Sequence, residues 1–246
     1  MVSLQQLTAS GAAAPLDAVE YRCRASLNLY DSPSGDGLAT QAAAGRHLHL
    51  LAFDRPDTQA ESAAMQVRLC EDDYVAWLKV ADLAELEPAE QPYQPITLSR
   101  QEIVARLPDA IAFAKAAMQV SNVYLWGGTV APNYDCSGLM QAAFASVGIW
   151  LPRDSYQQAD FVEPVAVDDL EAGDLLFFAK RDRVSHVALY LGDGHYLHSS
   201  GKDQGRNGIA IDPLSDSGDA VSQAYYRQLC HSGRITHSYQ PGEMKF

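Results

Sequence analysis

The stretch that decides the fold of the longer part of the chain is "NYDCSGLMQAAFASVG", residues 133–148. A polar turn leads to Cys136, and an apolar run with the length of a short helix begins directly behind it. Asp135 is a typical helix N-cap, and Gly148 is a typical C-terminal stop. We therefore predict a helix whose first residue is Cys136. The positive end of the helix dipole would favour the thiolate of that cysteine, which is the nucleophilic form.

The alternative is that Cys136 is a small buried apolar residue without a catalytic role. Two histidines further along the chain favour the catalytic interpretation. "RVSHVALYLGDG" places His186 early on an apolar strand, and "HYLHSS" places His198 late on the next one. A four-residue "LGDG" hairpin would pair these strands and bring the imidazoles within hydrogen-bonding distance. We expect Cys136 as nucleophile, His186 as its base and His198 as the group that orients the base.

A metal site built from Cys136, His186 and His198 is the competing interpretation. It lacks the closely spaced ligand pairs, such as CxxC or HxxxH, that metal sites commonly show. His195 is the closest rival of the two chosen histidines, but it sits at the turn of the hairpin. The other four histidines have no catalytic context, and we interpret them as surface or structural residues: His47, His49, His231 and His237.

The rest of the chain divides into an all-β part and an α+β part. Residues 1–16 are expected to form an arm, and residues 17–88 alternate apolar and polar positions in short runs, which predicts a small barrel. The proline-rich residues 89–98 predict an extended linker. Residues 99–246 run from helices to strands, which predicts helices packed on one face of an antiparallel sheet. Pro108 is expected to kink or interrupt the first helix.

Composition narrows the possible partners. The chain has 246 residues, is 47% hydrophobic and carries a formal net charge of −13. An acidic surface repels phosphate backbones, which argues against nucleic acid, and suits either solubility or a substrate with ammonium groups. The four cysteines show no disulfide or zinc-ribbon spacing, which indicates free thiols in a reducing compartment: Cys23, Cys70, Cys136 and Cys230.

The N-terminal stretch is too polar for a signal peptide, and no segment approaches the roughly 18 apolar residues that span a bilayer. We therefore expect a cytoplasmic protein without a membrane partner. The sequence carries no signal for an oligomeric state.

Several motifs together resemble the NlpC/P60 family of papain-like cysteine peptidases. They are "YLWGG", "DCSGL", "LPRDS", "GDLLFF" and "SHVALY" followed by a later histidine, in that order within about residues 99–240. The N-terminal part is similar to the bacterial SH3 domains that accompany this catalytic domain. The resemblance implies a Cys–His–His site on Cys136, His186 and His198, with no cofactor and no metal.

The arrangement also resembles the γ-D-glutamyl-L-diamino acid endopeptidases of cell-wall recycling. That resemblance implies cleavage of murein peptides of the type L-Ala-γ-D-Glu-diaminopimelate, with a free N-terminal L-alanine. It also implies a set of substrate contacts: Tyr124, Trp126, Asp135, Ser137, Asp154 and Ser155, with Tyr74 contributed by the SH3-like part.

Each of these residues also has a structural explanation. Tyr124 and Trp126 could belong to the core, Asp135 could be only a cap, Ser155 could cap the next helix, and Tyr74 could be barrel surface. At the level of the whole protein, two rivals remain. One is a catalytically inactive module that binds wall peptides, and the other is a related amidase or acyltransferase on the same scaffold.

Overall fold

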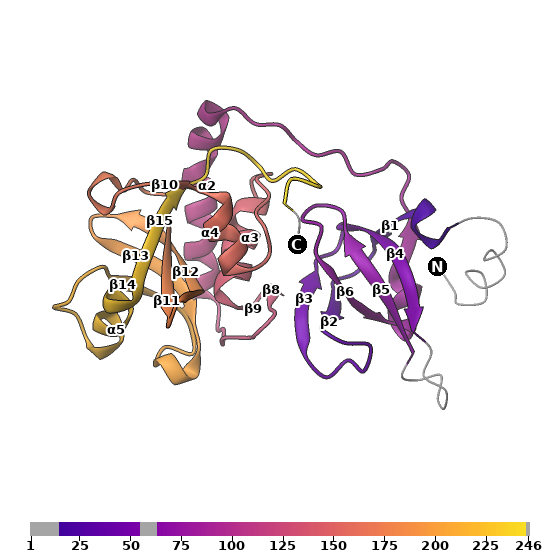
Figure 1. Cartoon of the computed structure of the whole chain (residues 1–246), viewed down its shortest axis with the longest axis horizontal. Helices are drawn as coiled ribbons and strands as arrows, with labels where there is room; N and C mark the ends of the chain where they lie inside the picture. Colours follow the sequence, from indigo (N-terminus) through magenta and orange to yellow (C-terminus); the bar gives the residue numbers. More distant parts are fainter. Residues whose placement is uncertain (1–14, 55–62, 245–246) are drawn as a thin grey trace. The chain divides into compact units, whose positions relative to one another are not determined.

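The computed structural model describes residues 15–54 and 63–244, which form two compact units (Figure 1). The first unit contains residues 15–95 and 240–244, and the second contains residues 96–239. The boundary lies inside the stretch expected to be a linker. Residues 240–244 were expected to be part of the second domain, but they belong to the first unit. There the amide of Gly242 donates to the carboxylate of Asp73 at 2.5 Å. Of the arm expected at residues 1–16, residues 1–14 lie outside the described part of the chain.

The first unit is an all-β domain. Its strands are β1 (Glu20–Cys23), β2 (Leu27–Tyr30), β3 (Leu38–Ala42), β4 (His47–Asp54), β5 (Ala64–Leu69), β6 (Val75–Lys79) and β7 (Leu86–Pro88), with 3-10 turns η1 (Leu16–Ala18) and η3 (Val80–Glu85). They form one sheet in the order β3-β2-β6-β5-β4-β1-β7, and every pair is antiparallel. Alternation places Leu48, Leu50 and Leu69 in its core. Among the described residues the ladder ends at β3 and β7, so the expected closure into a barrel by strand pairing is not found.

The second unit has an α+β fold. Its helices are α2 (Arg100–Gln119), α3 (Cys136–Ala145), α4 (Ser155–Phe161) and α5 (Ala220–Gln228). Its main sheet contains β10 (Glu163–Pro164), β11 (Leu175–Lys180), β12 (Arg183–Gly192), β13 (His195–Ser200), β14 (Gly208–Pro213) and β15 (Leu229–Arg234) in the order β10-β15-β11-β12-β13-β14. The strands β8 (Thr129–Val130) and β9 (Asn133–Tyr134) form a separate hairpin, and η4 (Val167–Asp169) and η5 (Lys202–Gln204) are short 3-10 turns. Within the described residues, no helix has the length and apolar character to cross a membrane.

Helix α2 corrects the expectation of an interruption at Pro108. The helix begins with the predicted capping box between Ser99 and Glu102 and continues through Pro108 as one 20-residue element. Pro108 is exposed. The carbonyl that loses its backbone partner to proline belongs to Val104, which is also exposed, so water can replace the missing hydrogen bond.

The central sheet is covered on both faces, which corrects the expectation of helices on one face. Leu175, Leu176, Phe177 and Phe178 are consecutive in β11, and all four are fully buried. Successive strand side chains point to opposite faces, so each face must be covered. Tyr225 of α5 packs with Leu176 and Phe178, while α3 and α4 contact β12 (Figure 1). Helix α5 therefore supplies a layer that the sequence analysis missed.

Candidate active site

Cys136 is the first residue of α3, as predicted. Asp135 is the N-cap, and its carboxylate accepts a hydrogen bond from the amide of Gly138 at 2.6 Å. Gly138 permits a close backbone contact, because a Cβ there would lie 2.0 Å from the carbonyl oxygen of Gly128. The backbones of the "WGG" and "DCSG" motifs are thus in direct contact, and this contact fixes the turn that precedes Cys136.

The electrostatic environment of Cys136 differs from the sequence expectation. Burial, followed by the charge of Asp135, raises the pKa of the Cys136 thiol to about 12. Backbone amides of Val187 and Ser137 act in the opposite direction but are outweighed. The helix terminus therefore does not ionise the cysteine by itself, because the desolvation of a buried thiolate is larger in free energy than its stabilisation by the nearby amide dipoles. A thiol in this position needs a base.

The hairpin of β12 and β13 places the two histidines together. Its loop is the two-residue turn Asp193–Gly194, both with positive φ, instead of the expected four-residue loop. Leu189 lies opposite Leu197. Continuing this register makes His186 and His198 a diagonal pair on one face of the sheet. The predicted hydrogen bond is present, with Nε2 of His186 2.8 Å from Nδ1 of His198.

Asp212 extends this pair into a chain of three groups, and sequence reasoning missed it. It lies on β14, where Oδ2 is 2.8 Å from Nε2 of His198. Although burial opposes ionisation, hydrogen bonds from His198 and Arg206 hold the pKa of the Asp212 carboxyl well below its usual range. The signal available in the sequence was an acidic residue inside the apolar strand "GIAIDPL". Its partner could not be identified without the pairing of β13 with β14.

The ionised Asp212 determines the tautomers of both rings. Because a carboxylate only accepts, Nε2 of His198 must carry a proton, and its Nδ1 is then the acceptor. Nε2 of His186 therefore donates to His198, which leaves the lone pair of His186 on Nδ1. Burial, followed by the charges of His198 and Lys180, lowers the pKa of His186 well below its ordinary value. His186 is thus a neutral imidazole with one nitrogen free to accept a proton.

Aromatic side chains fix the ring of His186. The centroid of Tyr225 lies 4.6 Å from that of His186, and the centroid of Phe178 lies 5.6 Å from it. The hydroxyl of Tyr225 is itself held by Ser200 at 2.8 Å. The exposed fractions are 8% for His186 and 0% for His198, so the orienting histidine is sealed from solvent.

A buried ion pair supports the turn before Cys136. Nη2 of Arg153 lies 2.6 Å from Oδ2 of Asp135, and its Nη1 lies 3.0 Å from the hydroxyl of Ser137. Arg153 is only 1% exposed. Asp135 is therefore both a helix cap and a partner of Arg153, and its expected contact with a substrate, like that of Ser137, stays a prediction.

A cavity of about 290 Å³ opens beside His186. Tyr124 and Trp126 line it together with Lys180, Asp203 and Tyr225. Trp126 is 73% exposed, so the explanation that it is a core residue is wrong. Burial, followed by the negative potential of Cys136, raises the pKa of Tyr124, which places this tyrosine in the electrostatic field of the sulfur. Lys180 and Asp203 are charged lining residues that the sequence analysis did not name.

The expected substrate contacts of Asp154, Ser155 and Tyr74 stay predictions. Asp154 is the N-cap of α4 and forms a capping box with Gln157, so Ser155 is the first helical residue and not the cap. Tyr74 belongs to the first unit, where it packs against the core. Within the described residues, Cys136, His186 and His198 do not form a cluster of metal-ligand geometry. Both ring nitrogens of His198 are already hydrogen-bonded, which disfavours the metal interpretation.

Comparison with known proteins identifies both units. Residues 121–231 match the NlpC/P60 family, and residues 29–83 match the bacterial dipeptidyl-peptidase Sh3 domain. The chain therefore carries an NlpC/P60 domain preceded by a bacterial SH3 domain, which confirms the resemblance drawn from the motifs.

Individual relatives match part of the chain. The gamma-D-glutamyl-L-lysine dipeptidyl-peptidase of Bacillus subtilis (strain 168) is 39% identical over 110 residues, which are 44% of this chain and 34% of the relative. The protein of the same name from Bacillus cereus is 39% identical over 98 residues, which are 39% of this chain and 28% of the relative. The chain thus spans about a third of the length of these curated relatives. An NlpC/P60 family protein from Bacillus cereus has a solved structure that is 25% identical, with a TM-score of 0.49, and covers 96% of this chain and 67% of that one.

Proposed function

We propose that this protein is a cysteine peptidase that hydrolyses the bond between γ-D-glutamate and a diamino acid in peptides derived from peptidoglycan. The observation that carries the proposal is the buried chain His186–His198–Asp212, with hydrogen bonds of 2.8 Å at each step. A buried imidazole with one nitrogen committed to an orienting partner is the arrangement of a general base. The matched NlpC/P60 domain supports the same assignment.

In the proposed reaction, Cys136 loses its proton to Nδ1 of His186 as the sulfur attacks the γ-glutamyl carbonyl. The imidazolium then donates that proton to the departing amine, and water hydrolyses the thioester with His186 again as base. The raised pKa of Cys136 supports ionisation during attack in place of a resting thiolate. The backbone amide of Cys136 would stabilise the oxyanion, and loss of one such donor typically costs about 3 kcal/mol of barrier.

The cavity beside His186 supports a substrate with charges of both signs. Lys180 and Asp203 lie in its wall, and Lys180 also acts electrostatically on His186. At the far end of its side chain diaminopimelate carries an ammonium and a carboxylate, whereas lysine carries only an ammonium there. We therefore propose diaminopimelate as the preferred diamino acid, although the relatives named above are named for L-lysine.

We further propose that the enzyme requires a free N-terminal L-alanine and acts in the cytoplasm on murein peptides during recycling. The name dipeptidyl-peptidase of the relatives supports recognition of a peptide N-terminus, since such enzymes release N-terminal dipeptides. Fractionation of the native cells tests the location, and recovery of the protein from the envelope would contradict a recycling role.

The decisive experiment compares L-Ala-γ-D-Glu-diaminopimelate with its N-acetylated copy and with the L-lysine analogue, using purified full-length protein. Release of L-Ala-D-Glu from the free peptide alone supports the proposal. Equal cleavage of the acetylated peptide would contradict recognition of the amine, and better cleavage of the lysine peptide would contradict the preference for diaminopimelate.

Cys136→Ala and Cys230→Ser are the matched variants for this assay. Cys230 is an exposed free thiol on β15. Cys136→Ala should abolish cleavage, and Cys230→Ser should retain it. Absence of cleavage by the intact protein would favour the inactive peptide-binding module.

A further inference from the structure

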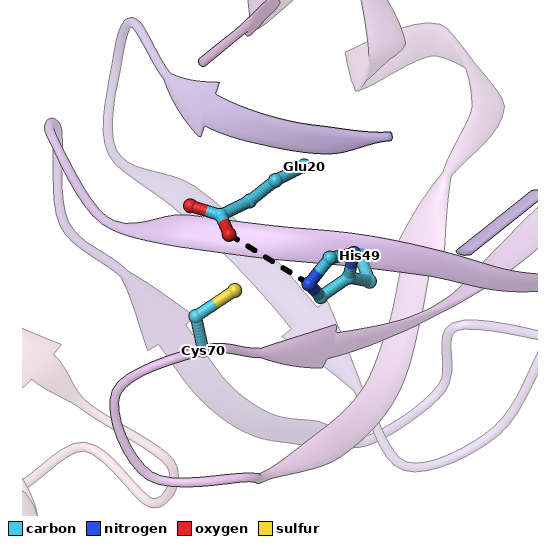
Figure 2. A group of neighbouring side chains, drawn as sticks. All are labelled: Glu20, His49 and Cys70. Carbon is cyan, nitrogen blue, oxygen red and sulfur yellow. Dashed lines mark ion pairs between the residues drawn. The ribbon is translucent and has the colours of Figure 1, made fainter. Parts of the chain in front are cut away.

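The first unit gathers three metal-ligating side chains on the outer face of its sheet. Glu20 of β1 lies directly opposite His49 of β4, and His49 lies opposite Arg68 of β5. Cys70 follows two residues after Arg68, so its side chain returns to the same face, diagonal to His49. Three residues separated by up to 50 positions in the chain thereby meet through the pairing of β1, β4 and β5 and the turn that follows β5 (Figure 2).

The ligand atoms of these three residues face one another. One atom from each of Glu20, His49 and Cys70 lies within 4.8 Å of the other two, and Oε2 of Glu20 is 3.8 Å from Nε2 of His49. Donors around a tetrahedral zinc ion, at 2.0 to 2.3 Å from the metal, are separated by about 3.3–3.8 Å. A closure of about 1 Å, within the freedom of the side-chain rotamers, would satisfy that geometry.

Neighbouring groups hold the carboxylate of Glu20 in position. Its Oε1 accepts hydrogen bonds from Nδ1 of His47 and from the backbone amide of Tyr93, the latter at 2.5 Å. These contacts use one oxygen and leave Oε2 directed at His49 (Figure 2). A hydrogen-bonded outer group that orients a ligating carboxylate is a regular feature of metal sites.

The other two ligands have no competing hydrogen bond in the described part of the chain. Nδ1 of His49 is buried without a partner, and the 3.8 Å from Nε2 to Glu20 is beyond hydrogen-bonding distance. The thiol of Cys70 is free and its side chain is buried. Nε2 of His49 and the sulfur of Cys70 are therefore available as metal ligands, whereas the unpaired Nδ1 of His49 would stay unpaired with or without a metal on Nε2.

We propose that Glu20, His49 and Cys70 bind a zinc ion, with a water molecule as the fourth ligand. One thiolate, one imidazole and one carboxylate are a donor set that suits zinc. A cavity of about 260 Å³ adjoins the three residues and has room for the water, which occupies about 30 Å³ in the liquid. The proposal concerns the SH3-type unit alone and does not depend on the peptidase assignment.

Zinc bound in this way would connect β1, β4 and the segment after β5, and so stabilise the first unit. The metal-free alternative is an ordinary pairing of Glu20 with His47 and His49, in which Cys70 has no role. The two cases differ in whether the sulfur binds a metal, which can be measured directly.

The test is titration of the full-length Cys136→Ala protein with Co²⁺, because this background removes the catalytic thiol as a ligand. Cobalt bound through sulfur gives a near-ultraviolet charge-transfer band, and tetrahedral cobalt gives intense visible bands. We expect saturation at one equivalent and displacement of the cobalt by Zn²⁺, which binds more tightly. Zn²⁺ should also raise the Tm of this protein.

The same titration on three further variants in that background assigns the ligands. Cys70→Ser should lose the charge-transfer band and weaken Zn²⁺ binding at least tenfold, and Glu20→Gln should retain the band but weaken binding. Cys230→Ser, the matched thiol control, should titrate like the parent. Absence of the band in the parent, or its persistence in Cys70→Ser, would overturn the proposal. If Cys70→Ser does not fold, the parent still tests the proposal through its band and its stoichiometry.

Discussion

Replacement of Asp212 by asparagine tests the role of the buried imidazole pair. Four donors surround the two oxygens of this carboxylate: Nε2 of His198, Nε and Nη2 of Arg206, and the hydroxyl of Ser222. Asparagine has nearly the same shape but offers one oxygen and one NH₂ group in place of two oxygens. In either orientation of the amide, the NH₂ group faces a donor: Nη2 of Arg206 in one, and His198 with Nε of Arg206 in the other. Only a clash with His198 can be relieved by a change of tautomer, so we expect the NH₂ group to face His198.

The consequence for catalysis follows from the tautomers. If the NH₂ group faces His198, that ring must accept at Nε2 and therefore carries its proton on Nδ1. His186 then accepts at Nε2 and holds its own proton on Nδ1, which is the nitrogen needed as base. General-base catalysis contributes about 10²–10⁴-fold to rate. Because Asp212 acts through one intervening ring, we expect kcat to fall about 10²- to 10³-fold with KM little changed.

The free energy of unfolding of the Asp212→Asn protein should also be lower than that of the wild type. Breaking a buried ion pair typically costs about 3–5 kcal/mol. Arg206 retains Asp219 as a partner at 2.8 Å and its side chain is 24% exposed, so we expect the lower end, about 3 kcal/mol. Since the folded pKa of Asp212 is depressed, its contribution is present above the unfolded pKa of about 4 and is lost as the pH falls through the folded pKa. The stabilities of the two proteins should therefore converge in acid.

The assay combines kcat and KM for the murein peptide with urea unfolding from pH 2 to 8. Arg206→Gln is the matched control, because it removes the cation but keeps the bond between His198 and Asp212. It should lose stability while kcat stays within about tenfold, as expected for a group outside the proton path. An Asp212→Asn enzyme with wild-type kcat and an unchanged pH profile would refute the assignment of Asp212 as the positioning residue of the base.

Four further outcomes are expected. Alkylation of Cys136 by iodoacetamide should accelerate with rising pH up to alkaline values, since burial raises the thiol pKa to about 12; a fast rate that is independent of pH from 6 upward would indicate a resting thiolate. Trp126→Ala should raise KM without loss of stability, because the ring is 73% exposed, and peptide kinetics beside thermal unfolding check this. Asp203→Asn should raise KM for the diaminopimelate peptide more than for a substrate lacking the distal ammonium; an equal effect on both would contradict a charge contact. Arg153→Met should destabilise the fold by about 3–5 kcal/mol in urea, because it leaves Asp135 buried without its cation.

The sequence by itself determined the elements that depend on local chemistry. The cap at Asp135, the helix that begins at Cys136 and the capping box at Ser99 are set by side chains that bond to backbone groups within three residues, so their spacing is visible in the chain. The hydrogen bond between His186 and His198 was also accessible, because a hairpin turn relates the two strands through nearby residues. The length of that turn was misjudged, since a bulge before Gly192 shortens the loop to two residues.

Only the tertiary structure decided the rest. The pKa of the Cys136 thiol depends on burial, to which many residues distant in the chain contribute. The prediction from the helix dipole alone, that this pKa is lowered, was therefore wrong. Asp212 reaches His198 through the pairing of β13 with β14, and Arg153 reaches Asp135 from beyond the end of α3. Strand register likewise brings together groups that are far apart in the chain. In the first unit it places Glu20 beside His49, and the turn after β5 adds Cys70. Such long-range pairings are settled by how whole strands and helices pack, and no local pattern in the chain records them.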